Sequence, residues 1–287
     1  MDAPAKEIGK GISDLINVLF TPIQAAVIFR NAWLDDFKEK INRKFNQIPT
    51  VRQISPPLNV IGPALDASRY YLEEEQMREM FANLVAHSCD SQMLSAVHPS
   101  FVNILTQLSP LDAKILMLFR PKQEMKIGLS ISTNENSNPT PELSGTGIYS
   151  FPETYLPIVN YLLAKNNTRR MIYSNIVSVP ACEEWEAISA SIVNLVRLGL
   201  IEIKYTQALA DDKYTSFYDN QAYKKLAEYI APGSPGSGFS ISTVRGNMLI
   251  HGEFDKIVLE KGFVRLTQMG FNFTKVCMIE SELISDR

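Results

Sequence analysis

The chain of 287 residues is poor in the two residue types that most often bind metals or cross-link small folds, since it has only three cysteines and three histidines. Cys89, Cys182 and Cys277 are odd in number and widely spaced, which argues against a disulfide framework and fits reduced thiols in the cytosol. No Cys-x-x-Cys or His-Glu-x-x-His spacing occurs, and His87 and Cys89 are two residues apart on a predicted helix, where they cannot share a face. We therefore expect no metal site and no cofactor.

The chain also lacks an excess of positive charge. Its 28 basic and 31 acidic residues give a net charge of −3, and the two halves are alike, with 14 basic and 16 acidic residues up to position 150 and 14 and 15 after it. A protein that coats nucleic acid needs a basic excess, because counterion release supplies its affinity. The balance excludes that class of protein and leaves room for a small basic pocket.

Patterns typical of catalysis are missing as well. No Gly-x-Ser-x-Gly sequence is present, and the glycine-rich stretches at 145–147 and 233–238 lack the Gly-Lys-Ser/Thr ending of a phosphate-binding loop. The acidic residues 73–75 are typical of the first turn of a helix, where the helix dipole favours negative charge. We expect no catalytic residues, and a nuclease or nucleotide hydrolase stays open as the enzymatic alternative.

No hydrophobic run is long enough for an ordinary membrane span. The most apolar uncharged run, residues 15–29, would form a helix of about 22 Å at 1.5 Å per residue, whereas a bilayer core is about 30 Å thick. No basic cluster precedes the run, so it does not resemble a secretory signal. It either packs in a core or between subunits, or enters a membrane as part of an oligomer with its polar residues facing water. The predicted membrane or pore residues are Leu15, Asn17, Leu19, Phe20, Gln24, Val27 and Phe29.

The first half of the chain is predicted to be helical. A helix over residues 4–47 is interrupted by Pro22, and its second part has an apolar stripe at helical spacing: Leu34, Phe37, Ile41, Phe45 and Ile48. Further helices are predicted from residue 62, over 73–87, after His98, and over 110–119, where Ser109 caps and Pro110 occupies the first position. Residues 132–150 are rich in Ser, Thr, Asn, Pro and Gly and predict a linker.

The second half is predicted to combine short helices with a strand pair. Helices are expected over 153–165, 171–177, 183–198 and 218–230, the third ending at Gly199. A strand follows from Leu200, a tight hairpin turn is expected at Lys261–Gly262, and Thr267 should cap a helix that runs to Cys277. This order predicts a winged-helix-like domain. The fold class is therefore α+β and mostly helical, with N-terminal helices (1–48), a central helical domain (49–131), the linker (132–150) and a winged-helix-like ligand-binding domain (151–287).

Basic residues in the second half alternate with tyrosines. Arginine and lysine bind phosphates and tyrosine rings stack on unpaired bases, so this mixture favours an oligonucleotide site, although a solvated surface would have the same composition. The predicted ligand-binding residues are Arg169, Arg170, Tyr173, Arg197, Lys204, Tyr205, Lys224 and Lys225.

The middle of the chain has two distinctive stretches, residues 56–90 and 97–116, with FANL at 81–84 and HPSF at 98–101 as their most specific parts. Through these stretches the chain resembles the abortive infection alpha family of bacterial proteins. It extends to 9–11 and Thr21–Pro22 upstream and to 194–201 and 264–267 downstream. It covers most of residues 5–120 and scattered parts of the remainder.

The resemblance implies anti-phage defence in which the infected cell is disabled before the virus matures. Some relatives are encoded beside nucleotidyltransferase-like enzymes, which implies control by a nucleotide or oligonucleotide signal and a possible partner enzyme of that kind. We expect a non-enzymatic homo-oligomeric effector at the bacterial inner membrane, with most of the chain in the cytoplasm. The alternative is a soluble winged-helix regulator that binds nucleic acid and dimerises through its N-terminal helices.

Overall fold

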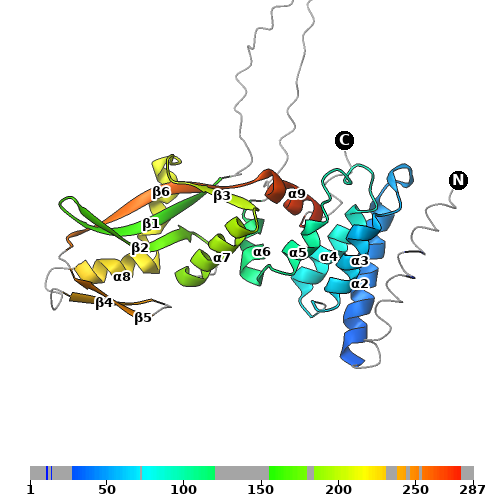
Figure 1. Cartoon of the computed structure of the whole chain (residues 1–287), viewed down its shortest axis with the longest axis horizontal. Helices are drawn as coiled ribbons and strands as arrows, with labels where there is room; N and C mark the ends of the chain where they lie inside the picture. Colours follow the sequence, from blue (N-terminus) through cyan, green and yellow to red (C-terminus); the bar gives the residue numbers. More distant parts are fainter. Residues whose placement is uncertain are drawn as a thin grey trace, which may run out of the picture.

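The structure is a computed structural model of the whole chain, and it describes residues 11, 14, 28–71, 73–119, 155–179, 184–230, 238–243, 246–251 and 254–278. The fold is mixed α+β, as predicted. Helices from the first half of the chain gather at one end of an elongated molecule, and an antiparallel sheet with its own helices forms the other end (Figure 1).

The helical end is built on an amphipathic helix. The apolar stripe predicted on α2 (Ile28–Gln47) is buried at every position from Leu34 to Ile48 and packs against α4 (Glu75–His87). The predicted start of α6 (Pro110–Met117) is confirmed, since Ser109 and Asp112 form a reciprocal capping box. The remaining elements of this end are the 3₁₀-helix η1 (Thr50–Arg52), α3 (Leu58–Ser68) and α5 (Ser100–Leu105).

The sheet end has four antiparallel strands in the order β2-β1-β6-β3. Strands β1 (Tyr155–Lys165) and β2 (Thr168–Val177) form a hairpin, and β6 (Lys256–Leu266) lies between β1 and the short β3 (Ile201–Lys204). A separate hairpin consists of β4 (Gly238–Thr243) and β5 (Gly246–His251). The helices of this end are α7 (Trp185–Arg197), the 3₁₀-helix η2 (Asp211–Tyr218), α8 (Gln221–Ile230) and α9 (Gln268–Cys277).

The helices predicted over 153–165 and 171–177 are wrong, because both segments are strands. β1 is buried on both faces: Ile158 belongs to the core shared with the helical end, and its neighbour Val159 belongs to the core beneath the sheet. A strand covered on both sides loses the alternation of apolar and polar residues that identifies strands in a sequence. β2 escapes detection because its register against β1 shifts twice, which breaks the period of two.

The hairpin turn predicted at Lys261–Gly262 is also wrong, since β6 runs without a break through both residues. The glycine at position 262 allows β6 to lie close to the end of β3. A Cβ built there would lie 2.5 Å from the carbonyl oxygen of Lys204 and 2.7 Å from Cδ1 of Tyr205. Because two helices and the turn of the predicted winged-helix arrangement are absent from the described residues, that arrangement is not confirmed. Predicted features that do hold are the end of α7 at Gly199 (φ 72°) and the Thr267 cap of α9.

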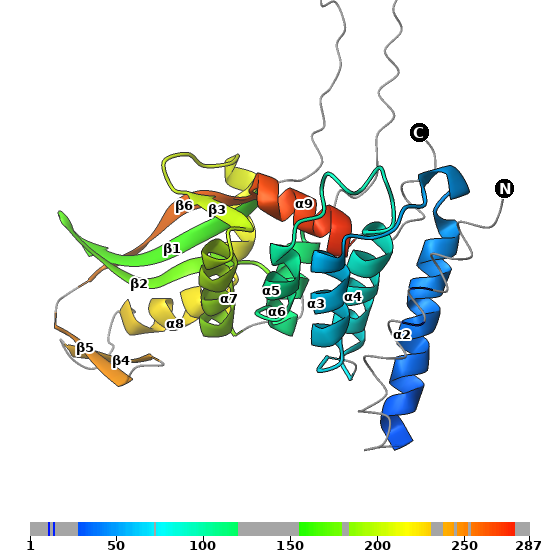
Figure 2. The same cartoon turned by 45° about the vertical axis from the view of Figure 1, so that its right-hand side comes forward.

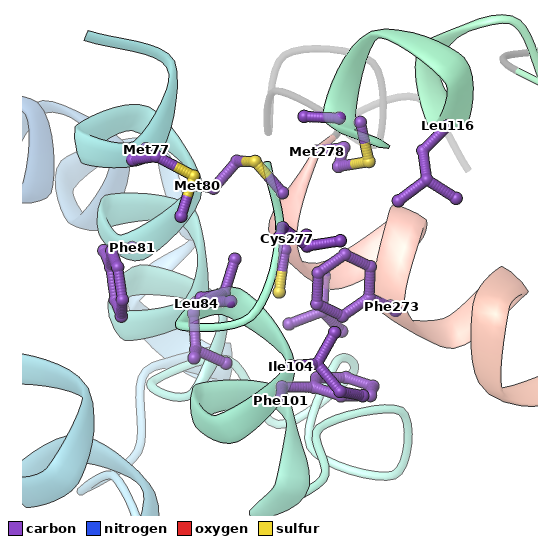
Figure 3. Close-up of a cluster of buried hydrophobic side chains, with 14 of the residues drawn as sticks. Met77, Met80, Phe81, Leu84, Phe101, Ile104, Leu116, Phe273, Cys277 and Met278 are labelled. Atoms are coloured by element: carbon purple, nitrogen blue, oxygen red, sulfur yellow. The ribbon is translucent and has the colours of Figure 1, made fainter. Parts of the chain in front are cut away.

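Helix α9 connects the two ends. It follows β6 directly and crosses from the sheet to α4 (Figure 2). Its apolar side fills a core made by α4, α5 and α6, where Phe273 meets Phe101 edge to face at 5.3 Å (Figure 3). Side chains from before and after the predicted linker therefore share one hydrophobic core, while the predicted domain boundaries themselves stay a prediction.

Among the described residues, no helix combines the length and apolarity needed to cross a membrane. The side chains of all seven predicted membrane residues, the predicted kink at Pro22 and the predicted linker lie outside the residues whose placement is described.

Candidate functional site

An aromatic core lies beneath one face of the sheet. Val159, Tyr161 and Leu163 of β1 point to this face and are covered by Ala222 and Leu226 of α8. Tyrosines line the same layer: the rings of Tyr161 and Tyr223 are 6.0 Å apart, and Tyr218 meets Tyr223 edge to face at 5.3 Å. Cations reach this layer from α8 and β6, which gives the mixture of rings and positive charge expected from the sequence.

Trp185, the first residue of α7, is the centre of one part of this layer. The Tyr173 ring of β2 lies 5.6 Å from it at 56°, and the Lys225 ammonium of α8 lies 4.4 Å from its centroid. Tyr229, one helical turn after Lys225, packs on the same core. Trp185 is 7% exposed, and its indole nitrogen has no hydrogen-bond acceptor among the described residues. An unpaired buried donor is unusual in a folded protein and marks this position for attention.

Burial raises the pKa of the Tyr173 hydroxyl, and the neighbouring Tyr229 and Glu186 add to the effect. Tyr173 is therefore neutral at physiological pH and able to donate a hydrogen bond. Together, Tyr173, Trp185 and Lys225 present three donors and two rings. This combination suits a planar ligand with acceptor oxygens, and we call these three residues the Trp185 cluster.

Only two of the eight predicted ligand-binding residues, Tyr173 and Lys225, meet in this cluster. Lys224 is their exposed neighbour on α8. Arg169 and Arg170 lie near the start of β2, opposite Ala164 and Leu163 of β1.

Lys204 and Tyr205 are used by the fold. Lys204 pairs with Glu202 at 3.3 Å. The Tyr205 hydroxyl lies 2.8 Å from Oδ1 of Asn160 and 3.1 Å from Oδ1 of Asn175, and burial raises its pKa. Asn160 in turn donates to Glu260 at 2.7 Å. This network holds the irregular part of the β1–β2 pairing in place, so Tyr205 is a structural residue here.

Arg197 is far from the cluster along α7. Its guanidinium donates to Asn194 of the same helix and to Oε1 of Gln107 at 3.0 Å. It therefore attaches α7 to the segment between α5 and α6. The eight predicted residues do not form one surface.

Trp185 was not predicted as a site residue. The sequence holds no local signal for it, because its contacts depend on the approach of β2 and α8 to the start of α7. Lys261 was also outside the predicted set, and it pairs with Asp211 at 2.8 Å over the Tyr214 ring.

The described residues contain no group of three or more His, Cys, Asp or Glu side chains that could hold a metal ion. Burial raises the pKa of the Cys89 thiol to about 12, and that of the buried Cys277 thiol is raised as well. Both thiols are therefore protonated and poor nucleophiles.

A model of the abortive infection alpha family matches residues 30–277. The chain belongs to this family. The family indicates a role in abortive infection, in agreement with the resemblance seen in residues 56–116. The match begins in α2 and ends with α9, so it spans both ends of the molecule. Neither the curated proteins nor the solved structures yield a significant match to the chain.

Proposed function

We propose that this family member is a non-enzymatic effector of abortive infection. In this proposal, copies of the chain assemble and permeabilise the inner membrane through the run at 15–29, with most of the chain in the cytoplasm. A nucleotide or short single-stranded oligonucleotide bound at the sheet end sets the state of the effector. A nucleotidyltransferase-like enzyme would be a suitable source of that signal.

The observation that carries the proposal is that the apolar face of α2 is already buried within the protein. From Leu34 to Ile48 its apolar stripe is already covered by α4, and charged pairs reinforce the contact, with Arg78 2.9 Å from Asp36 and Lys40 3.1 Å from Glu79. This part of α2 therefore has no apolar face left for a membrane or for another subunit. The proposal therefore assigns the membrane role to the run at 15–29, the other apolar segment of the N-terminal helices.

The connection between the two ends supports control by a ligand. β6 forms part of the aromatic layer through Ile257 and Leu259 and leads directly into α9. α4 holds α9 at its C-terminal end, since Asn83 donates to the Cys277 carbonyl at 2.9 Å. A ligand controls an effector only if it binds the two states unequally, and this arrangement offers a physical route for that difference.

Dye entry into cells tests the membrane part of the proposal. Leu19→Lys and Phe20→Lys place charge in the run, and both should abolish uptake of a membrane-impermeant dye and restore growth. Val51→Lys is the matched control, because Val51 is 94% exposed and lies outside the run. Equal thermal stability of the purified variants would show that the fold is intact. If the lysine variants still admit dye, the run is not the membrane element.

The soluble regulator is the second candidate, and the order of α7, β3 and β6 favours it. Helix α7 is followed by β3, which pairs with β6 as the two strands of a wing would, although η2, α8, β4 and β5 lie between these strands in the chain. The outer face of α7 is poorly suited to DNA, however, because Val193 and Val196 are exposed there at 54% and 41%. Band shifts with duplex DNA that weaken steeply with salt would favour this candidate. Metal-dependent cleavage abolished by a single Asp or Glu substitution would instead favour an enzyme.

A further inference from the structure

We infer that the Trp185 cluster is the site that recognises the ligand, and that it takes a nucleotide unit whose base has an acceptor oxygen or nitrogen. The inference rests on the proposed function for the kind of ligand, and on the geometry of the cluster for the place. The base accepts a hydrogen bond from the indole nitrogen of Trp185, and the phosphate is bound by Lys225.

The indole nitrogen is the first argument. Trp185 is more than nine-tenths buried, yet its donor has no partner among the described residues. A site built to hydrogen-bond a ligand rejects analogues that lack the matching group, because the buried donor is then left unpaired. The indole therefore supplies selectivity for an acceptor on the base.

The position of Trp185 on its helix is the second argument. It is the first residue of a helix of 13 residues, and Glu184 at the N-cap makes no side-chain hydrogen bond to the first turn. Backbone N–H groups at such an end favour acceptors and anions. Glu186 in the same turn opposes a fully charged group there. We therefore place the neutral base near the helix end and the phosphate at Lys225.

Lys225 is the third argument, because it explains how a ligand enters. The indole nitrogen is closed to solvent, and Lys225, which covers one face of the ring, is the exposed member of the cluster. A ligand that draws the ammonium onto its phosphate removes it from the ring, and the freed indole can then turn its in-plane N–H toward the base. The ligand-free and ligand-bound forms then differ in the position of one lysine on α8. Control of the effector requires, in addition, that the cluster be arranged differently in its two states.

The chain offers a direct reporter for this event. It has two tryptophans, Trp33 on α2 and Trp185. In the full-length Trp33→Phe variant, all tryptophan fluorescence comes from the cluster. Titration with uridine monophosphate should change this fluorescence saturably, whereas uridine and inorganic phosphate should each bind at least tenfold more weakly. A short oligouridylate, titrated in parallel, shows whether the site prefers a free nucleotide or a strand.

Substitutions assign the binding to the cluster. By calorimetry, Trp185→Phe, which keeps a ring and removes the donor, should weaken nucleotide binding about tenfold, and Lys225→Met should do the same. Lys114→Met on α6 is the control, since Lys114 is an exposed lysine outside the cluster. Far-ultraviolet circular dichroism and thermal melts should show that all three variants fold.

Two results would overturn the inference. One is nucleotide binding with unchanged affinity in both cluster variants, which would place the ligand elsewhere on the protein. The other is the absence of saturable binding of every probe to folded protein. Neither result alters the dye-entry experiment, which depends on residues 15–29, so failure of this site and failure of the membrane proposal are separable.

Discussion

Nδ1 of His87 on α4 lies 2.6 Å from the carbonyl oxygen of Val276 in the last turn of α9. A carbonyl oxygen only accepts, so the imidazole carries its proton on Nδ1. The last carbonyls of a helix have no partner within the helix. Here His87 and Asn83 supply two of the missing donors, and α4 thereby holds the helix that links the sheet to the helical end.

This contact predicts a dependence of stability on pH. Burial lowers the pKa of His87 from 6.5, against the opposing effects of the Val276 bond and the Asp90 charge, while Lys44 and Lys275 add to the lowering. The unfolded chain therefore binds more protons than the folded one just below this value. Stability is complete above 6.5 and falls as the pH drops toward the lowered pKa.

Melting temperatures between about pH 7 and about pH 5.5 check this expectation. The natural protein should lose stability across this range, and His87→Gln, whose amide donates without titrating, should show a flatter profile. Equal slopes for the two proteins would mean that another group causes the loss.

The buried ion pair between α2 and α4 predicts a second effect. The side chain of Lys44 is 3% exposed and contacts Glu79, which also lies 3.1 Å from Lys40. Glu79→Gln leaves the Lys44 ammonium buried without a carboxylate, so it should destabilise the protein by about 3 kcal/mol in urea unfolding. Glu39→Gln, at an exposed position of α2, should change stability by less than about 0.5 kcal/mol. Similar values for both would mean that the pair contributes little.

Glu79 should also determine how stability depends on pH, in a more acidic range than His87. Burial alone would raise its pKa, but the hydrogen bonds and charges of Lys44 and Lys40 outweigh burial and lower it below 4.5. The stabilisation is thus present above 4.5 and is lost as the pH falls through the lowered value. The Glu79→Gln variant should show a weaker loss in this acidic range.

Two glycines give a matched pair of alanine substitutions. A Cβ at Gly270 in α9 would lie 1.9 Å from the Leu200 carbonyl oxygen, whereas a Cβ at Gly62 in α3 would meet nothing within 4 Å. Gly270→Ala should therefore cost at least about 2 kcal/mol through displacement of α9 from β3. Gly62→Ala should change stability by less than about 1 kcal/mol, because the gain in helix propensity is opposed by the crowding of its Cβ against the ring of Pro63. Thermal unfolding of both variants measures the difference, and a tolerated Gly270→Ala would refute the tight approach.

Tyr205 separates a structural role from a ligand-binding role. Tyr205→Phe removes the hydroxyl that contacts Asn160 and Asn175, so it should lower stability by about 1 kcal/mol. Its affinity for a nucleotide should equal that of the natural protein. A loss of affinity at unchanged stability would return Tyr205 to the binding site, as the sequence predicted.

Local signals in the sequence were sufficient to predict an element where residues close in the chain determine its structure. The stripe from Leu34 to Ile48, the Ser109 cap and the Gly199 stop are each set by neighbours within a few residues. The sequence did not identify β1 as a strand, because Ile158 and Val159 are adjacent and both buried, each in a different core. No pattern within the strand records that two layers cover it.

The sequence could predict which kinds of residue make up the candidate site, but not which particular residues meet there. Tyr173 and Lys225 are in both the predicted set and the Trp185 cluster, because the alternation of rings and cations in this part of the chain led to their prediction. Their common partner, Trp185, depends on a strand and two helices that meet only in three dimensions. Lys204 and Arg197 carry the positive charge that a phosphate needs. In the fold, however, Lys204 pairs with Glu202, and Arg197 donates a hydrogen bond to Gln107.

The place of α9 in the chain has a consequence for biosynthesis. The ribosome completes α4, α5 and α6 long before it reaches residue 268, so their shared core lacks Phe273 and Cys277 until the sheet has been made. At about 5–20 residues per second this delay is roughly 8–30 s. A nascent chain thus carries an unfinished N-terminal bundle throughout translation of the sheet, and a truncated product would remain in that incomplete form.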